Sequence, residues 1–324
     1  MVRKTLAARL VPLAAVLALF AGCTTPPAAP PVPVIGLSFI PNVQFAPFYV
    51  AAERDLFGGA ALRHHGASEG LFTAIAAGEE QFIVAGGDEA LQAREEGVDL
   101  VAVASYYRAY PVRVIARADA GIATLADLRG KKVGVPGRYG ESWFGMLVAL
   151  KSAGLSESDV DIQEIGYTHQ AALATKKVDA AVGFVNNDLV QDQLAGLDVV
   201  ALSLTASGEP PLVGASLFTT RAYLNAHRDV VARVAKGFVG GMAAVVADPE
   251  AALTISATRI PDLSGEQALT SARATLTATI PVMADARGSV DAAQWQAMAD
   301  FLLGAGVLTK PADVAAAIDT TIIS

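Results

Sequence analysis

The chain has 324 residues, with 24 Lys and Arg against 32 Asp and Glu, and its formal net charge is −8. An acidic balance argues against nucleic acid or an anionic membrane surface as a partner. The length exceeds what one hydrophobic core usually holds, so we expect two lobes. Because Cys23 is the only cysteine, an intrachain disulfide and a cysteine metal cluster are both excluded.

The first 22 residues have the layout of a secretory signal. Arg3, Lys4 and Arg9 form a basic start, and the uncharged run 10–21 that follows is too short to span a bilayer as a stable helix. Removing the signal would leave 21 basic against 32 acidic residues, a formal charge of −11. The run ends in Phe-Ala-Gly-Cys, which looks like a bacterial lipobox, so we expect lipidation of Cys23. The alternative is an ordinary cleaved signal with an incidental cysteine.

The Pro-rich segment 23–33 is typical of a stiff, extended tether. We therefore expect the folded part to lie outside the cytoplasm, held at the membrane only by the lipid. No apolar stretch after residue 22 is expected to form a second membrane segment.

From Val34 onward, short β-rich runs alternate with helical patterns, which indicates an α/β fold with largely parallel sheets. The predicted strands are 34–38, 81–85, 100–104, 112–116, 132–135, 178–183 and 199–204. The predicted helices between them are 46–56, 70–77, 89–96, 124–128, 142–153, 169–175 and 187–195. From about Thr219 the pattern is helical, over 220–248, 249–260, 264–280 and 291–305.

The helix-rich C-terminal third needs a sheet to cover, so we expect it to pack back on the first lobe. The chain would then cross between the lobes twice, a hinge architecture suited to closing around a ligand. We expect residues 34–111 and 211–324 to form the first lobe and 112–210 to form the second.

Several predicted strands end in turns that carry aromatic, amide or acidic side chains. In an open α/β sheet, ligands bind in the crevice outside the carboxyl ends of the strands. Aromatic rings offer flat faces, and amides offer both donors and acceptors, so these turns predict a site for a planar molecule with polar edges. The candidate ligand-binding residues are Asn42, Gln44, Phe45, His65, Glu69, Gly87, Asp88, Tyr107, Tyr110, Tyr139, Glu141, Trp143, Phe184, Asn186 and Asn187.

Structural roles compete with ligand binding at these positions. The role of Phe45 could be limited to packing its helix onto the sheet. The tyrosines of 106–110 could form either a connector between the lobes or an aromatic platform for a ligand. Asp88 is expected to cap the helix that follows Gly86 and Gly87, whose missing side chains would let the backbone approach a ligand.

The segment 130–145 carries the sharpest local pattern, a strand that ends at Pro136 before a helix that begins near Ser142. Tyr139 and Trp143 could stack on a ring, and Glu141 could accept hydrogen bonds from it. The glycines of this segment match neither the phosphate loop nor the dinucleotide fingerprint.

No complete set of nucleophile, base and orienting residue is visible, and no metal-binding pattern is visible either. His64 and His65 would point to opposite faces of a strand, and no carboxylate stands beside them at metal-ligand spacing. Residues 66–70 match Gly-x-Ser-x-Gly just after His64 and His65, and we interpret this segment as a loop at a strand end. We therefore expect a binding protein without a metal or cofactor, and not an enzyme.

Four segments make the chain resemble the periplasmic solute-binding proteins of bacterial ABC importers, in the group that binds alkanesulfonates, nitrate or thiamine pyrimidine precursors. These segments are 40–49, 127–135, 139–145 and 185–187. The second is common to the whole superfamily, and the aromatic and amide segments are more discriminating. Within the group the chain looks closest to the riboflavin-binding and thiamine-precursor-binding lipoproteins, whose ligands are planar heterocycles.

The resemblance implies a two-lobed type II periplasmic binding protein fold and a monomer that captures riboflavin or a thiamine pyrimidine precursor by cleft closure. It also implies docking onto a membrane permease with its ATPase. The alternatives are an alkanesulfonate- or nitrate-type receptor and a ligand-sensing module for a membrane receptor. The eukaryotic pyrimidine-synthase relatives are enzymes with a cysteine-rich motif that this chain lacks. The segment 55–62 is several residues shorter than the counterpart that supplies the second strand in relatives, and the aim of His64 and His65 depends on that strand.

Overall fold

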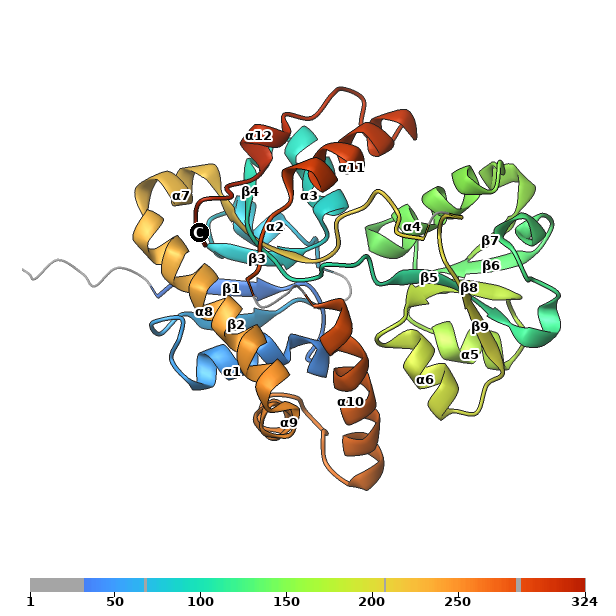
Figure 1. Ribbon diagram of the computed structural model, residues 1–324, viewed down its shortest axis with the longest axis horizontal. Helices are drawn as coiled ribbons and strands as arrows, with labels where there is room; N and C mark the ends of the chain where they lie inside the picture. Colours follow the sequence, from blue (N-terminus) through green and yellow to red (C-terminus); the bar gives the residue numbers. More distant parts are fainter. Residues whose placement is uncertain (1–31, 67–68, 207, 284–286, 324) are drawn as a thin grey trace, which may run out of the picture. The chain divides into compact units, whose positions relative to one another are not determined.

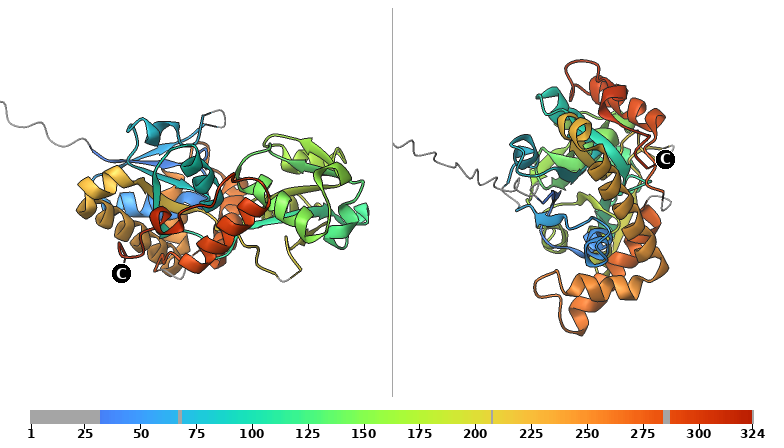
Figure 2. Two further views of the ribbon diagram at one scale, coloured as in Figure 1. Left: turned by 90° about the horizontal axis from the view of Figure 1, so that it is seen from above. Right: turned by 90° about the vertical axis from the view of Figure 1, so that its left-hand side faces the viewer.

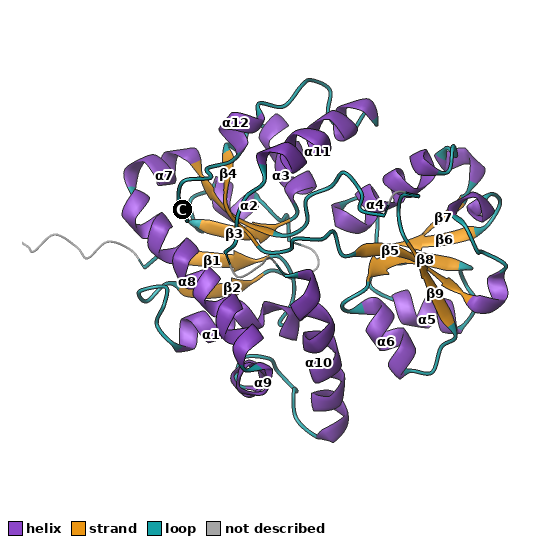
Figure 3. Ribbon diagram, in the orientation of Figure 1, coloured by secondary structure: helices purple, strands orange, loops and turns teal. Residues whose placement is uncertain are grey.

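The computed structural model describes residues 32–66, 69–206, 208–283 and 287–323. The predicted signal, Cys23 and nearly all of the predicted tether lie outside the described residues. The unit Val32–Ser324 builds two five-stranded sheets, each with helices on both faces (Figures 1 and 3).

The first sheet has the strand order β2-β1-β3-β10-β4. Its strands are β1 (Val34–Leu37), β2 (Ala61–His64), β3 (Phe82–Ala85), β4 (Leu100–Ser105) and β10 (Ser216–Thr220). β1 pairs in parallel with β2 and β3, whereas β10 lies antiparallel between β3 and β4. The chain therefore returns from the second sheet to complete the first, which confirms the expected two crossings.

The second sheet repeats this topology in the order β7-β6-β8-β5-β9. Its strands are β5 (Val112–Arg117), β6 (Lys132–Val135), β7 (Asp161–Glu164), β8 (Ala180–Phe184) and β9 (Val199–Leu202). β6 pairs in parallel with β7 and β8, and β5 is antiparallel to β8 and β9. In each sheet the strand that arrives from the other lobe runs against its neighbours.

The helices are α1 (Ala46–Glu53), α2 (Thr73–Ala76), α3 (Gly87–Glu95), α4 (Gly140–Ser152), α5 (His169–Ala174), α6 (Asp188–Leu194), α7 (Arg221–Ala226), α8 (Arg228–Ala247), α9 (Pro249–Ala257), α10 (Glu266–Thr279), α11 (Ala292–Gly304) and α12 (Val314–Ala317). One core lies between the first sheet and α1, α8, α9 and α10. A second core runs from the opposite side of that sheet, under α3 and α11, to α4 of the second lobe.

Four expectations about elements were wrong. The predicted strands omit β2, β7 and β10, and the predicted helix over 220–248 is two helices, α7 and α8. The structure breaks that helix at His227, whose φ of −138° and ψ of 42° are not helical. β2 and β7 are partly exposed edge strands with a weak apolar alternation, and β10 is a five-residue run without a turn before the next helix.

Within the described part of the chain, one helix, α8, is long enough and apolar enough to cross a membrane, judged by length and composition alone. This corrects the expectation that no such stretch follows residue 22. Its apolar positions face α1, where Phe238 stacks on Phe48 with ring centroids 4.5 Å apart, and Figure 2 shows the two helices side by side. The apolar stripe of α8 is therefore a core-facing surface.

Candidate functional site

A pocket of about 300 Å³ lies between the two lobes, at the carboxyl ends of strands from both sheets. Its walls come from the turns after β1, β4, β6, β7 and β8 and from the first turns of α3, α4 and α6. The main lining residues are Ser38, Phe39, Gln44, Phe45, Glu89, Tyr106, Tyr107, Tyr139, Glu141, Ser142, Tyr167, His169, Phe184, Asn187 and Asp188. Carboxyl ends of strands from both sheets therefore meet at this pocket.

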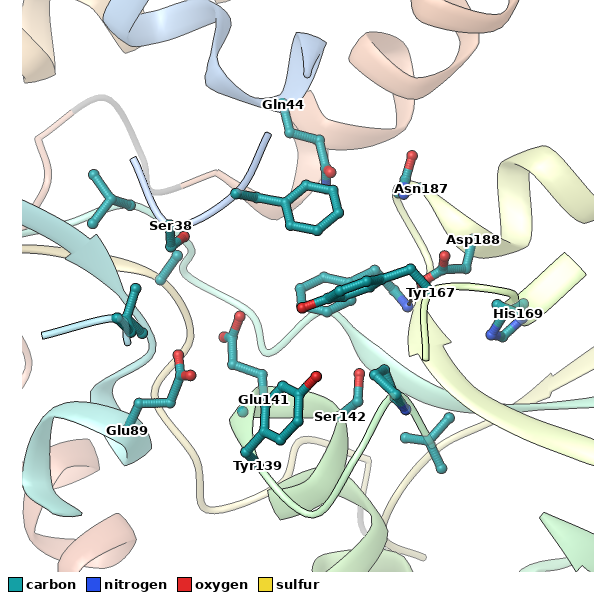
Figure 4. A pocket seen from close by; sticks show the side chains of 18 of the residues that line it. Ser38, Gln44, Glu89, Tyr139, Glu141, Ser142, Tyr167, His169, Asn187 and Asp188 are labelled. Carbon is teal, nitrogen blue, oxygen red and sulfur yellow. Dashed lines mark hydrogen bonds between the residues drawn. The ribbon is translucent and has the colours of Figure 1, made fainter. Parts of the chain in front are cut away.

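Aromatic rings form the middle of the pocket. Figure 4 shows Tyr139 and Tyr167 there, and both side chains are about half exposed, at 54% and 53%. Phe39 of the first lobe meets Tyr167 of the second edge to face, with ring centroids 5.2 Å apart. These rings can contact the faces of a planar ligand while it is partly in solvent.

Carboxyl groups form one end of the pocket, next to the start of α3. Gly86 is the N-cap of α3, and its N–H donates to Glu89 Oε2 at 3.0 Å, so the expectation that Asp88 caps this helix was wrong. A Cβ on Gly86 would lie 2.4 Å from Asp88 Oδ1 and 2.8 Å from Glu141 Cγ. The missing side chain of Gly86 therefore makes room for the side chains of Asp88, Glu89 and Glu141. It does not serve the approach of a ligand to the backbone, which was the expected role.

Burial keeps these carboxyl groups protonated to higher pH than usual. It raises the pKa of Asp88 to about 8, with the charge of Glu89 adding to the effect, and raises the pKa of Glu89 to about 7. Burial, together with the charges of Asp88 and Glu89, also raises the pKa of Glu141 well above its usual value. Glu141 Oε1 is buried without a hydrogen-bond partner, so it is free to bind a ligand atom.

The opposite end of the pocket carries Asn187, Asp188 and His169 (Figure 4). Asp188 Oδ2 accepts a hydrogen bond from the Phe184 N–H at 2.7 Å, and His169 Nε2 lies 3.1 Å from Asp192 Oδ2. Burial opposes charge on His169, but the hydrogen bond to Asp192 and the charges of Asp188 and Asp192 together outweigh it and raise the pKa of the imidazole. The pocket is thus polar at both ends and aromatic between them.

No lysine or arginine lines this pocket in the described part of the chain. His169 can carry a positive charge there, and its ring is already bonded to Asp192. The first turns of α3 and α4, whose N–H groups otherwise attract anions, carry Asp88, Glu89 and Glu141. The electrostatics therefore disfavour an anionic ligand.

The structure brings seven of the predicted site residues to the pocket wall, and they are Gln44, Phe45, Tyr107, Tyr139, Glu141, Phe184 and Asn187. Two more, His65 and Glu69, line an adjoining cavity. The remaining six predicted residues lie outside both sets of lining residues, and they are Asn42, Gly87, Asp88, Tyr110, Trp143 and Asn186.

The six residues outside the lining have structural contacts. Asn42 caps the short 3₁₀ helix η1 (Val43–Phe45), and Gly87 packs on Val213. The Asn186 side chain donates to Tyr107 Oη at 3.2 Å and to Thr279 Oγ1 at 3.1 Å. The Trp143 ring is buried, with the Arg138 guanidinium 4.8 Å from its centroid.

Asp88 and Tyr110 are buried and hydrogen-bonded to each other at 2.7 Å. They act on the pocket through Glu141, whose backbone carbonyl accepts from the Tyr110 hydroxyl, also at 2.7 Å. This contact joins α3 of the first lobe to α4 of the second.

Sequence reasoning missed several lining residues, above all Phe39, Tyr167, His169 and Asp188. Tyr167 follows β7, and without that strand its turn was not recognised as a strand end. The alternation of apolar Val160 and Ile162 with polar Asp161 and Gln163 was the pattern that could have indicated this strand.

A two-lobed α/β fold with a ligand-sized pocket between its lobes defines a solute-binding protein of the periplasmic type. The chain belongs to the NMT1/THI5-like family, whose profile matches residues 42–252. It is 30% identical to the riboflavin-binding protein RibY of Chloroflexus aurantiacus, over 90% of this chain and 89% of that protein. It is 25% identical to the formylaminopyrimidine-binding protein of Halalkalibacterium halodurans, over 68% of each chain.

Solved structures of low sequence identity share the fold. The alkanesulfonate-binding protein SsuA of Xanthomonas axonopodis, bound to MOPS, superposes with a TM-score of 0.70 at 20% identity. The match covers 90% of this chain and 99% of that one. This likeness confirms the expected two-lobed architecture.

Proposed function

We propose that the protein is the lipid-anchored, extracytoplasmic solute receptor of an ABC importer, and that its ligand is an uncharged planar heterocycle of the flavin or pyrimidine type. The ligand would lie between the lobes and be delivered to a membrane permease driven by an ATPase. The likeness to binding proteins for riboflavin and formylaminopyrimidine supports this ligand class.

The observation that carries the proposal is the chemistry of the pocket wall. Glu89 and Glu141, two carboxyl groups with raised pKa values, line it together with a set of exposed rings, without a lysine or arginine among the described lining residues. A protonated carboxyl group can donate to a ring carbonyl or ring nitrogen, and a neutral ligand does not need a counter-charge. A sulfonate or nitrate would meet carboxyl groups where it needs cations.

The proposed binding contacts combine stacking with hydrogen bonds at the two ends of the ring. Phe45, Tyr139 and Tyr167 would cover its faces, Glu141 would bond one edge, and Asn187 the other. We propose that the two lobes, 34–111 with 211–324 and 112–210, close on this ligand. Existing contacts between α6 and α10, such as Gln191 Nε2 to Thr275 Oγ1 at 3.0 Å, would guide that motion.

Ligand-induced thermal stabilisation tests the proposal. The protein without its first 33 residues would be titrated with riboflavin, formylaminopyrimidine and an aliphatic sulfonate. Binding stabilises the native state by an amount that grows with ligand concentration over Kd. We expect stabilisation by a heterocycle and none by the sulfonate. Stabilisation by the sulfonate alone would overturn the ligand class.

Anchoring is tested separately in cells. We expect full-length protein to partition with the membrane and the Cys23→Ala variant to be released in soluble form. Equal partitioning of both forms would refute the lipid anchor.

A further inference from the structure

A second cavity of about 430 Å³ opens beside the pocket and shares Ser38, Phe39, Tyr139 and Tyr167 with it as a common wall. Its own wall carries His65, Gly66, Glu69, Gln92 and Glu96, among others, and we call it the side compartment. Among the lining residues that the side compartment does not share with the pocket, polar side chains outnumber aromatic ones. A ligand that occupied only the pocket would leave this space to water.

His65 lines the side compartment and has one ring nitrogen without a hydrogen-bond partner. Its ring is 2% exposed, and Nε2 lies 2.9 Å and 3.0 Å from the two carboxylate oxygens of Glu80 and 3.3 Å from Arg63 Nη1. Because the carboxylate can only accept and lies nearer, Nε2–H donates to Glu80. The other nitrogen, Nδ1, is buried without a hydrogen-bond partner, and the nearest Glu69 oxygen is 3.9 Å away. Buried polar atoms are normally paired, so Nδ1 is positioned for a ligand group.

The charges around His65 are already paired. Arg63, which is outside the lining, bonds both Glu69 and Glu80, with its Nη1 2.6 Å from Glu80 Oε1. The described lining of the side compartment has no lysine or arginine, whereas Glu69, Glu89 and Glu96 contribute carboxyl groups. A phosphate placed there would meet carboxylates and no free cation.

A hydroxyl group satisfies these conditions. Neutral His65 with its proton on Nε2 offers Nδ1 as an acceptor, and the charged ring offers it as a donor. A hydroxyl both donates and accepts, so it can pair with Nδ1 in either state and also bond to Glu69 or Gln92.

We propose that the side compartment binds an uncharged, hydroxylated chain attached to the ring held in the pocket, and that it excludes the phosphorylated form of that chain. This inference rests on the proposed function and deepens it, because it selects a flavin with a free polyol chain over a bare pyrimidine. His65 is then a specificity-determining residue that contacts the chain and not the ring.

The test compares three flavins by fluorescence or calorimetric titration: riboflavin, lumichrome, which is the ring without the chain, and riboflavin phosphate. We expect riboflavin to bind about tenfold more tightly than lumichrome, since one or two net hydrogen bonds give that factor. We expect riboflavin phosphate to bind at least as weakly as lumichrome.

The variants separate the chain from the ring. His65→Gln keeps an amide near the position of Nε2 for Glu80 and removes the Nδ1 function, so it should weaken riboflavin about five- to tenfold and leave lumichrome unchanged. Gly66→Leu fills the side compartment from a position where an added Cβ meets nothing within 4 Å. It should abolish the preference for riboflavin. His227→Ala, an exposed histidine outside both cavities, is the matched control.

The outcomes distinguish the two proposals. If wild-type protein binds riboflavin and lumichrome equally, or binds riboflavin phosphate as tightly as riboflavin, the side-compartment proposal is overturned and the proposed function stands. If wild-type protein binds none of the three, while formylaminopyrimidine stabilises it, the polyol ligand is wrong and the heterocycle class survives. If no heterocycle binds, the proposed function itself fails. Thermal unfolding without ligand shows whether each variant is folded.

Discussion

The Tyr110 hydroxyl lies 2.7 Å from Asp88 Oδ2 and, at the same distance, 2.7 Å from the backbone carbonyl of Glu141. A phenol has one proton, and burial holds the pKa of Tyr110 well above its usual value, so this proton stays in place. A carbonyl can only accept, so the hydroxyl donates to Glu141. The contact with Asp88 then requires a proton on the Asp88 carboxyl, in agreement with its raised pKa of about 8.

The protonation of Asp88 predicts that stability falls as pH rises. The pKa of Asp88 is about 8 in the folded protein against 3.8 as its usual value, so the native state binds the proton more tightly than the unfolded state does. The contribution is therefore fully present below about pH 4 and is lost as pH rises to about 8. Glu89 and Glu141, whose pKa values are also raised, act in the same direction.

Asp88→Asn replaces the protonated carboxyl with an amide that can donate to Tyr110 at every pH. We expect the melting temperature of this variant to depend less on pH between about 4 and 8 than that of wild type. Thermal unfolding monitored by circular dichroism at several pH values measures it. Asp99→Asn, an exposed carboxyl group, is the control and should keep the wild-type profile. A profile for Asp88→Asn that matches wild type would contradict the protonated state.

Glu141 predicts how ligand binding depends on pH. If its orphan Oε1 atom donates to the ligand, binding should weaken as pH rises through the raised pKa of this carboxyl, because the ionised form only accepts. Glu141→Gln keeps a donor at all pH values, so its affinity should be nearly independent of pH. Glu141→Ala should lose about 1–2 kcal/mol of binding free energy, roughly tenfold in Kd. Equal pH profiles for wild type and Glu141→Gln would exclude Glu141 as the donor.

Replacing Tyr167 should lower the affinity for the ligand without lowering the stability of the protein. Its side chain is 53% exposed, and burial together with a hydrogen bond to Tyr139 raises the pKa of its phenol to about 12, so the ring remains neutral. Tyr167→Ala removes one stacking surface and should weaken a planar ligand by about 1–3 kcal/mol. Leu194→Ala, at a similarly exposed position outside the pocket, serves as control. The same Kd for Tyr167→Ala and wild type would remove this ring from the site.

An element can be predicted from the sequence when the residues that determine it are close to one another in the chain. The strand over 132–135 and the helices that begin near Ala46 and Ala292 follow from local apolar patterns and caps, and the structure confirms them. The strand β10 could not be predicted, since its place between β3 and β4 is set by contacts more than 100 residues away in the chain.

The candidate site divides in the same way. Strand-end turns pointed to Gln44, Tyr139, Glu141 and Asn187, because the fold class places such turns at the sheet edge. The sequence does not reveal that Tyr110 and Asp88 are hydrogen-bonded beneath the pocket. It also does not reveal that one ring nitrogen of His65 is hydrogen-bonded to Glu80. Those relations join different elements and depend on side-chain direction.

The contact between α1 and α8 predicts a strong difference between two adjacent glycines. A Cβ on Gly241 would lie 2.1 Å from the Pro47 carbonyl oxygen, a backbone atom that cannot move without shifting α1. A Cβ on Gly240 would meet only the flexible end of Leu56, at 3.2 Å. We expect Gly241→Ala to lower the free energy of unfolding by about 2–3 kcal/mol, the range of overpacked cores. Gly240→Ala should be neutral or stabilising by up to about 1 kcal/mol, because alanine is the better helix former. Urea unfolding of the two variants measures both values, and equal stabilities would mean that α8 does not pack on α1 at this distance.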